Sequence, residues 1–378
     1  MSRTVALLLK GEVSSILKSL GARNLYKCYQ CGTCTAACPL SEEVTASFRK
    51  AVKYAQLGLE EKIAADPAPW LCYACGECSE MCPKDAKPTE ILAALRRYSI
   101  IKYDWTGFSK RFYLSKTFEL MSIAILSILT ALIVYLFKGP VITERVDLSA
   151  FAQPTVAIAN IIVFGVLSLI LLINIYRMYK FTTSQSSSSG KLPVSTYIAE
   201  FIKIIPYHFL TQRLMARCRD GKYYYTIHLL LFYGYAVIFV HHILRHMLLP
   251  LISPTLHLNE VASSIVGISA FVALILGSSL AIYGRIKKST IIWEYSHPTD
   301  WVFITLLWLT SITGLLTDIF KYSGLPLPTY VTFTVHLMFV VPLLVLEVPF
   351  AKWSHLAYRP FALYFNRLNE IKQLRYKT

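Results

Sequence analysis

Eight of the nine cysteines in this chain fall into two copies of one motif, CxxCxxCxxxCP. The first copy contains Cys28, Cys31, Cys34 and Cys38, and the second contains Cys72, Cys75, Cys78 and Cys82. Each iron of a cubane cluster needs one thiolate, and in this spacing three cysteines hold one cluster while the fourth reaches the other cluster. The repeat therefore predicts two [4Fe-4S] clusters.

The crossed pairing assigns a ligand set to each cluster. Cluster one is predicted to be held by Cys28, Cys31, Cys34 and Cys82, and cluster two by Cys72, Cys75, Cys78 and Cys38. Two structural zinc sites are the alternative, but tetrahedral zinc does not require a proline after the fourth cysteine. Disulfides are disfavoured because the cysteines cluster regularly and no secretory signal is recognised. The ninth cysteine, Cys218, has no partner motif and is expected to be inert.

Most of the remaining sequence is apolar enough to cross a membrane. Of the 378 residues, 55% are hydrophobic and 16% are charged, which excludes a purely soluble globule. Several segments approach the ~20 apolar residues that one crossing needs. They are residues 117–137, 155–176, 225–249, 261–283, 301–320 and 330–350. Residues 42–65, between the motifs, show apolar residues at helical spacing, so the whole fold is predicted to be all-α.

Histidines inside the apolar segments are the second chemical signal, because an ionisable residue within a crossing is costly. On one ideal helix His228 and His242 lie ~21 Å apart along the axis and ~40° apart around it, which suits two stacked haems. Depth pairs His228 with His355 for an inner haem and His242 with His336 for an outer haem. His241 and His246 are expected to bond a neighbouring helix, although either could replace His242.

The phase of the last crossing needs a further assumption. His336 and His355 would lie ~28 Å apart and about 100° out of phase on a straight helix. Pro342 and Pro349 lie between them and are expected to kink the helix. The predicted domains are therefore a helical ferredoxin domain at 1–103 and a membrane cytochrome b domain with a six-helix bundle at 104–378.

The distribution of basic residues predicts the orientation. The formal net charge is +16, but most Lys and Arg lie in short segments between apolar runs, which disfavours nucleic acid binding. They concentrate on the side that holds the N-terminus, the 180–222 loop and the C-terminus. We therefore expect a multi-pass protein of a prokaryotic inner membrane with the head and both termini in the cytoplasm. The 180–222 loop is predicted to be flexible at its serine-rich start and to contain a surface helix within 194–218.

Several stretches resemble known families. The head, with Cys28-Tyr-Gln-Cys31-Gly-Thr-Cys34 and Trp70-Leu-Cys72, resembles the small iron-sulfur subunit of heterodisulfide reductases. Residues 336–360, 238–242 and 314–317 resemble crossings of the cytochrome b subunit of respiratory nitrate reductase. The fusion of the two is similar to the C-subunit of the quinone-interacting membrane-bound oxidoreductases.

That resemblance implies a function. Proteins of this type carry electrons, in either direction, between menaquinone and cytoplasmic flavin and iron-sulfur subunits that serve adenylylsulfate reductase in sulfur metabolism. We expect the quinone near the outer haem, among Arg245, His246, His257 and Glu260.

Two other functions stay open. The first is a membrane subunit of a heterodisulfide reductase; the chain has no adjacent cysteines, so the thiol chemistry would lie on another subunit. The second is a membrane anchor without haem. Nucleotide loops, flavin fingerprints and nucleophile triads are not recognised, so no substrate chemistry is expected of the chain by itself.

Overall fold

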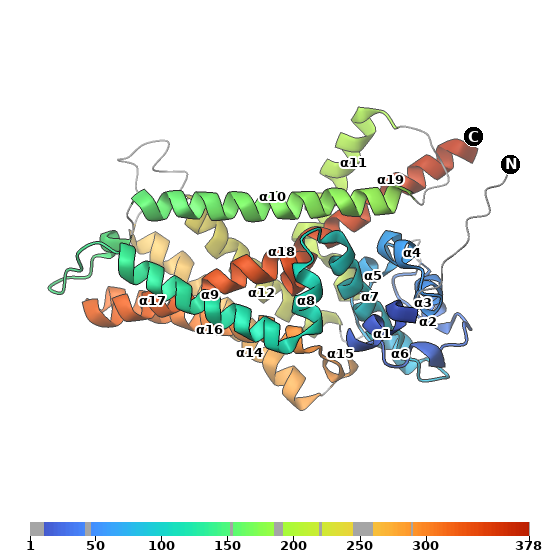
Figure 1. Ribbon diagram of the computed structural model, residues 1–378, viewed down its shortest axis with the longest axis horizontal. Helices are drawn as coiled ribbons and strands as arrows, with labels where there is room; N and C mark the ends of the chain where they lie inside the picture. The colour runs from blue at the N-terminus through green and yellow to red at the C-terminus, as the bar shows by residue number, and fades with distance from the viewer. Residues whose placement is uncertain are drawn as a thin grey trace. The chain divides into compact units, whose positions relative to one another are not determined.

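The computed structural model describes residues 11–41, 47–151, 154–184, 192–218, 221–244, 260–288 and 290–377. Across these residues every regular element is a helix, and none is a strand (Figure 1). The all-α prediction is confirmed.

The cysteine-bearing part of the chain consists of short helices around one longer helix. They are α1 (Gly11–Ser19), η1 (Leu25–Lys27), α2 (Thr33–Ala36), α3 (Phe48–Gln56), α4 (Glu60–Ala65), α5 (Ala68–Leu71), α6 (Glu77–Glu80) and α7 (Pro88–Tyr103). Leu17, Val52, Ile63, Ile91 and Leu95 are buried and form a core to which these helices contribute. Apolar burial of this kind stabilises helices that are too short to persist alone.

The two motifs fold into the same local shape. The short helices α2 and α6 each begin after a left-handed glycine, Gly32 at φ 90° and Gly76 at φ 89°. Two residues before each glycine the backbone is also left-handed, at Gln30 (φ 68°) and Ala74 (φ 57°). Because non-glycine residues adopt this conformation at a cost of roughly 1–3 kcal/mol, its repetition indicates that both cysteine loops require it.

Among the described residues, six helices are long and apolar enough to span a membrane. The spans are Lys116–Phe137, Ile161–Thr183, Lys222–Ile243, Ala262–Lys287, Pro298–Tyr322 and Pro326–Phe350. They belong to α9 (Lys116–Phe137), α10 (Pro154–Ser184), α12 (Gly221–Ile243), α14 (Glu260–Lys287), α16 (Pro298–Tyr322) and α17 (Pro326–Pro342) with its continuation through η6 (Leu343–Glu347) and α18 (Val348–Phe350). The chain is thus a multi-pass membrane protein, as predicted. The predicted third crossing ends at 249, outside the described residues.

Shorter helices connect and follow the spans. They are α8 (Phe108–Leu114), η2 (Leu148–Phe151), α11 (Val194–Pro206), η3 (Tyr207–Thr211), η4 (Arg213–Arg217), α15 (Ile291–Glu294), η7 (Lys352–Ser354) and α19 (His355–Lys377). Helix α11 lies in the segment for which a surface helix is predicted. It packs against α19, and Tyr364 of α19 donates a hydrogen bond to the carbonyl of Tyr197 in α11 at 3.1 Å.

The last crossing is interrupted where the prolines predict a kink. Helix α17 ends at Pro342 and continues as the π turn η6. After Phe350 the backbone of Ala351 is extended, at φ −126° and ψ −147°, and α19 then begins at His355. His336 and His355 therefore lie on separate helices, and the phase of a straight helix does not relate them.

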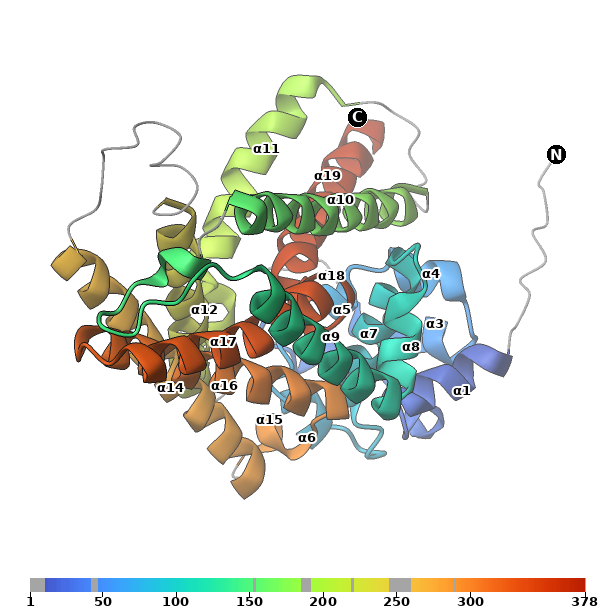
Figure 2. The ribbon, with the colours of Figure 1, turned by 60° about the vertical axis from the view of Figure 1, so that its left-hand side comes forward.

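The chain divides into two compact units. The first comprises Met1–Glu119, Ser168–Lys222 and Val348–Thr378, and the second comprises Leu120–Leu167 and Tyr223–Glu347. In the first unit α19 packs against α5 and α11, and in the second α16 packs against α14 and α17 (Figure 2). The domain boundary at residue 103 stays a prediction.

Candidate iron-sulfur and haem sites

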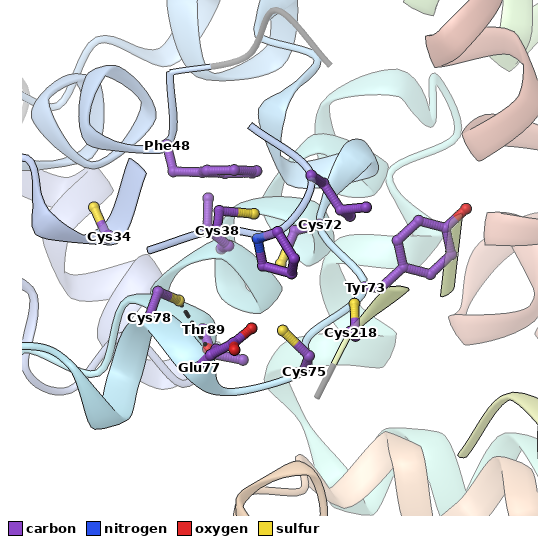
Figure 3. Close-up of a pocket in the computed structure, with 13 residues that line it drawn as sticks. Cys34, Cys38, Phe48, Cys72, Tyr73, Cys75, Glu77, Cys78, Thr89 and Cys218 are labelled. Atoms are coloured by element: carbon purple, nitrogen blue, oxygen red, sulfur yellow. Dashed lines mark hydrogen bonds between the residues drawn. The ribbon is translucent and has the colours of Figure 1, made fainter. Parts of the chain in front are cut away.

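One cavity in the first unit gathers cysteines from both motifs. It encloses about 340 Å³ of space, part of it open to solvent. Its wall includes Cys38 from the first motif and Cys72, Cys75 and Cys78 from the second, which are the residues assigned to cluster two (Figure 3). Cys34, which is assigned to cluster one, also lines the cavity. Phe48 and Leu92 cover the apolar side. The arrangement is the one that a crossed fourth ligand requires, and the thiols fit an iron-sulfur cluster.

The four residues assigned to cluster one interact electrostatically. Burial is the main cause that raises the pKa of the Cys34 thiol, and the charges of Cys28, Cys31 and Cys82 raise it further. Cys82 therefore acts on the first motif although it belongs to the second. Cys31 is exposed, and its hydrogen bond with Thr33 lowers its pKa.

Hydrogen bonds reach three sulfur atoms of the second motif. The amide of Ala74 donates to Sγ of Cys72 at 3.3 Å, and the amide of Ala86 donates to Sγ of Cys82 at 3.3 Å. The hydroxyl of Thr89 lies 3.2 Å from Sγ of Cys78. Donors to a thiolate stabilise its negative charge, which both iron ligation and the reduced state of a cluster need.

Burial opposes ionisation of the cluster two thiols. It raises the pKa of Cys38 to about 12 and raises the pKa of Cys78 as well. Since only thiolates ligate iron, loading of the cluster must release these protons.

Cys218 lies in the same cavity, although the sequence offers no partner for it. It is buried, and Figure 3 shows its sulfur beside that of Cys75. A hydrogen bond between the two thiols lowers the pKa of Cys75 to about 7 and raises the pKa of Cys218. The only signal in the sequence is that Cys218 is the odd cysteine, and its position far from both motifs hides the contact.

Two arginines meet at the first cysteine of the second motif. Nη2 of Arg96 in α7 donates to the Cys72 carbonyl at 2.6 Å, and Nη2 of Arg359 in α19 donates to the same oxygen at 2.7 Å. Burial raises the pKa of the Cys72 thiol, and both guanidinium charges oppose this effect. Neither arginine belongs to a cysteine motif, so the sequence gives no sign that they bind the Cys72 carbonyl.

In the second unit, His336 has the hydrogen bonds expected of an iron ligand. Its Nδ1 lies 3.0 Å from the carbonyl of Thr310, which requires that Nδ1 carry the proton. The lone pair then resides on Nε2, the state that a metal ligand needs. His242 lies in α12 and is close enough to His336 to interact with it electrostatically.

Gly314 makes room for the His336 ring. A Cβ at this position would overlap the ring of Phe271 and lie 3.1 Å from Cε1 of His336. The hydrogen bond of His241 differs from that of His336, because its Nε2 is 2.7 Å from Oγ of Ser263 in α14. His241 therefore bonds a neighbouring helix, which is the role expected for it from the sequence.

The predicted inner pair is divided between the two units. Nδ1 of His355 donates to the carbonyl of Lys352 at 2.6 Å, which again leaves the lone pair on Nε2. His355 belongs to the first unit and His228 to the second, so their pairing stays a prediction. Of the predicted quinone residues, Arg245, His246 and His257 lie outside the described residues, and only the backbone of Glu260 is described.

Comparisons with known proteins support the iron-sulfur part. Residues 24–86 match the family model of the 4Fe-4S dicluster domain. The chain is 40% identical over 96 residues to a protein of Archaeoglobus profundus that is described as like the C-subunit of heterodisulfide reductase, covering 25% of this chain and 51% of that protein. It is 38% identical over 60 residues to the C-subunit of the H(2):CoB-CoM heterodisulfide,ferredoxin reductase of Methanothermobacter thermautotrophicus, covering 16% and 32% of the two chains.

A third relative gives the same result. The C2-subunit of the H(2)/formate:CoB-CoM heterodisulfide,ferredoxin reductase of Methanococcus maripaludis is 39% identical over 79 residues, which covers 21% of this chain and 42% of that one. The chain thus spans at most about half the length of these relatives. No solved structure matches. The findings agree on an iron-sulfur protein with a role in electron transfer, whose dicluster domain shares a chain with six membrane-length helices.

Proposed function

We propose that this protein carries electrons between menaquinone in the membrane and a cytoplasmic flavin and iron-sulfur partner, in sulfur metabolism. Two [4Fe-4S] clusters and two b haems would supply the one-electron centres when bound. The observation that carries the proposal is the presence, in one chain, of a cavity lined by cysteines of both motifs and of a membrane-helix histidine, His336, whose Nδ1 is fixed by a carbonyl.

The proposal gives a role to each of four histidines. His242 and His336 would ligate the outer haem iron, and His228 and His355 the inner one. The carbonyls of Thr310 and Lys352 hold Nδ1–H of His336 and His355, so that each ring presents Nε2. The predicted quinone site remains among Arg245, His246, His257 and Glu260, and oxidation of a quinol there releases two electrons and two protons.

The test is the spectrum of the full chain purified in mild detergent. We expect a b-type band in the reduced-minus-oxidised absorbance, and His336→Leu should remove about half of it because one of two haems loses a ligand. His241→Leu is the matched control and should leave the band intact, since His241 bonds Ser263. A wild-type protein without the band would exclude the haem proposal and leave the membrane anchor.

A second candidate is the membrane subunit of a heterodisulfide-reductase-type complex, which the names of the relatives favour. Both candidates predict a hetero-oligomeric complex. The partners that co-purify in mild detergent distinguish them, because heterodisulfide chemistry would require a partner protein with paired cysteines. Isolation with flavin subunits that serve adenylylsulfate reductase would support the first candidate.

A further inference from the structure

The two cysteine motifs share a backbone shape but differ in the groups that bind their first carbonyl. The Cys28 carbonyl accepts a hydrogen bond from Nε2 of Gln56 at 2.7 Å. The equivalent Cys72 carbonyl accepts from Arg96 at 2.6 Å and from Arg359 at 2.7 Å. The first carbonyl of the first motif is thus bound by a neutral amide, whereas that of the second motif is bound by two permanently charged guanidinium groups.

The two guanidinium groups are held in place by several further contacts. Nε of Arg96 also donates to the Pro69 carbonyl at 3.0 Å. The guanidinium of Arg359 stacks on the ring of Tyr73, 4.1 Å from its centroid. Such fixed charges beside a partly buried site act through a low dielectric and are weakly screened.

The helix that carries Arg359 is itself anchored to the second motif. Tyr358 packs on Trp70 with ring centroids 5.3 Å apart, and on Tyr103 at 5.4 Å. None of these three side chains is more than 1% exposed. Helix α5, which carries Trp70, ends at the residue before Cys72. Arg359 therefore reaches Cys72 through a packed contact between helices rather than through a long, mobile side chain.

We propose that Arg96 and Arg359 are positioning residues that set the reduction potential of cluster two above that of cluster one. A cluster gains one negative charge when one electron reduces it from the 2+ to the 1+ state, and nearby positive charge stabilises that state. The inference rests on the proposed function only in treating cluster two as redox-active. Arg359 lies one helical turn after His355, the predicted inner haem ligand, on the same helix. Through Arg359 this helix contacts the cysteine motif of cluster two.

The experiment is a redox titration of the full chain in mild detergent, with dithionite as reductant and electron paramagnetic resonance as readout. Cys75→Ser perturbs a ligand of cluster two alone and identifies its signal. In the wild type we expect the cluster two signal at the higher potential. Arg359→Gln should move it to lower potential and leave the cluster one signal in place, and the double variant with Arg96→Gln should move it further. Arg359→Lys keeps the charge and should restore part of the shift.

Arg367→Gln provides the matched control. Arg367 lies on the same helix, about two turns beyond Arg359. It pairs with Glu200 and Glu370 and is exposed, so its replacement removes the same charge without removing a hydrogen bond to the Cys72 carbonyl. It should change neither potential. Iron content is measured for every variant.

Three results would overturn the proposal. The first is an unchanged cluster two potential in Arg359→Gln at full iron content, and the second is an equal shift of both clusters. The third is an equal loss of iron in Arg359→Gln and Arg359→Lys, with no change in the potential of the cluster two signal that remains. That result would mean that Arg359 only stabilises the fold. Dithionite reduces the clusters without haem or quinone, so these results are independent of the absorbance test of the proposed function.

Discussion

At the residue scale, the thiols are distinguished by their environments. Cys31 is exposed, whereas Cys38 and Cys78 are buried enough for their pKa values to rise. The Cys75 thiol shares a hydrogen bond with Cys218, a cysteine outside both motifs. The two motifs share their cysteine spacing, so the spacing alone does not account for these differences, and the residues packed around each thiol contribute to them.

The crossed ligand assignment predicts which cluster each fourth cysteine serves. Cys38→Ser should weaken or remove the cluster two signal, which Cys75→Ser also perturbs, and should spare the signal perturbed by Cys31→Ser. Cys82→Ser should do the reverse, because its sulfur lies with the first motif. Electron paramagnetic resonance of the reduced variants checks this, and fourth ligands that serve their own motif would contradict it.

Gly314 predicts a second change at a single position. Gly314→Ala should reduce the haem content, because the added Cβ must displace Phe271 or the His336 ring. Gly267→Ala is the control, since its Cβ would be 3.5 Å from Oδ2 of Asp318, an ordinary contact. Haem is measured by absorbance per protein, and equal loading of both variants would show that the ring does not need this space.

At the element scale, the sequence predicts which segments are helical better than where they end. The second crossing is predicted to end at Tyr176, before the charge of Arg177, but α10 continues to Ser184. The reason is that Arg177 has partners: it donates to the carbonyls of Tyr103 at 2.7 Å and Lys102 at 3.0 Å. Arg177 therefore lies inside α10 with its guanidinium bonded to backbone carbonyls, and it does not mark the end of the helix.

The buried hydroxyl of Tyr103 joins helices of the first unit. It donates to the Ala64 carbonyl at 2.6 Å and accepts from Nε1 of Trp70 at 3.4 Å. Tyr103→Phe should cost about 1–3 kcal/mol, because two buried groups lose a partner. We expect a lower midpoint of thermal unfolding by tryptophan fluorescence. Tyr26→Phe, at a side chain that is 57% exposed, should leave the midpoint unchanged, and equal midpoints for both variants would contradict the role given to Tyr103.

At the scale of the whole molecule, the sequence accounts for the fold class and for the cysteines that gather in the cavity. The spacing of a motif predicts which residues near one another in sequence act together, and hydropathy predicts the membrane spans. Neither reports that Cys218 and Arg359 reach the second motif, because those contacts depend on how distant helices pack. The contact between Arg359 and Cys72 spans 287 residues of sequence.

The orientation is also a property of the whole chain. Lys and Arg are concentrated in the 177–222, 285–288 and 359–377 segments, so these segments are expected in the cytoplasm. Alkaline phosphatase fused after Ile142 should be active in the periplasm, and a fusion at Thr378 should be inactive. Green fluorescent protein at the same two positions should give the opposite pattern, and an inverted result would reverse the proposed topology.

The contact of α19 with the second motif also bears on biosynthesis. The cysteines of both motifs are translated before the membrane spans, whereas Tyr358 and Arg359 are translated after them. A nascent chain that stops before α19 therefore exposes Trp70 and the Cys72 loop without their covering helix. The Cys72 carbonyl therefore gains its hydrogen bond from Arg359 only after the membrane spans and α19 have been synthesised.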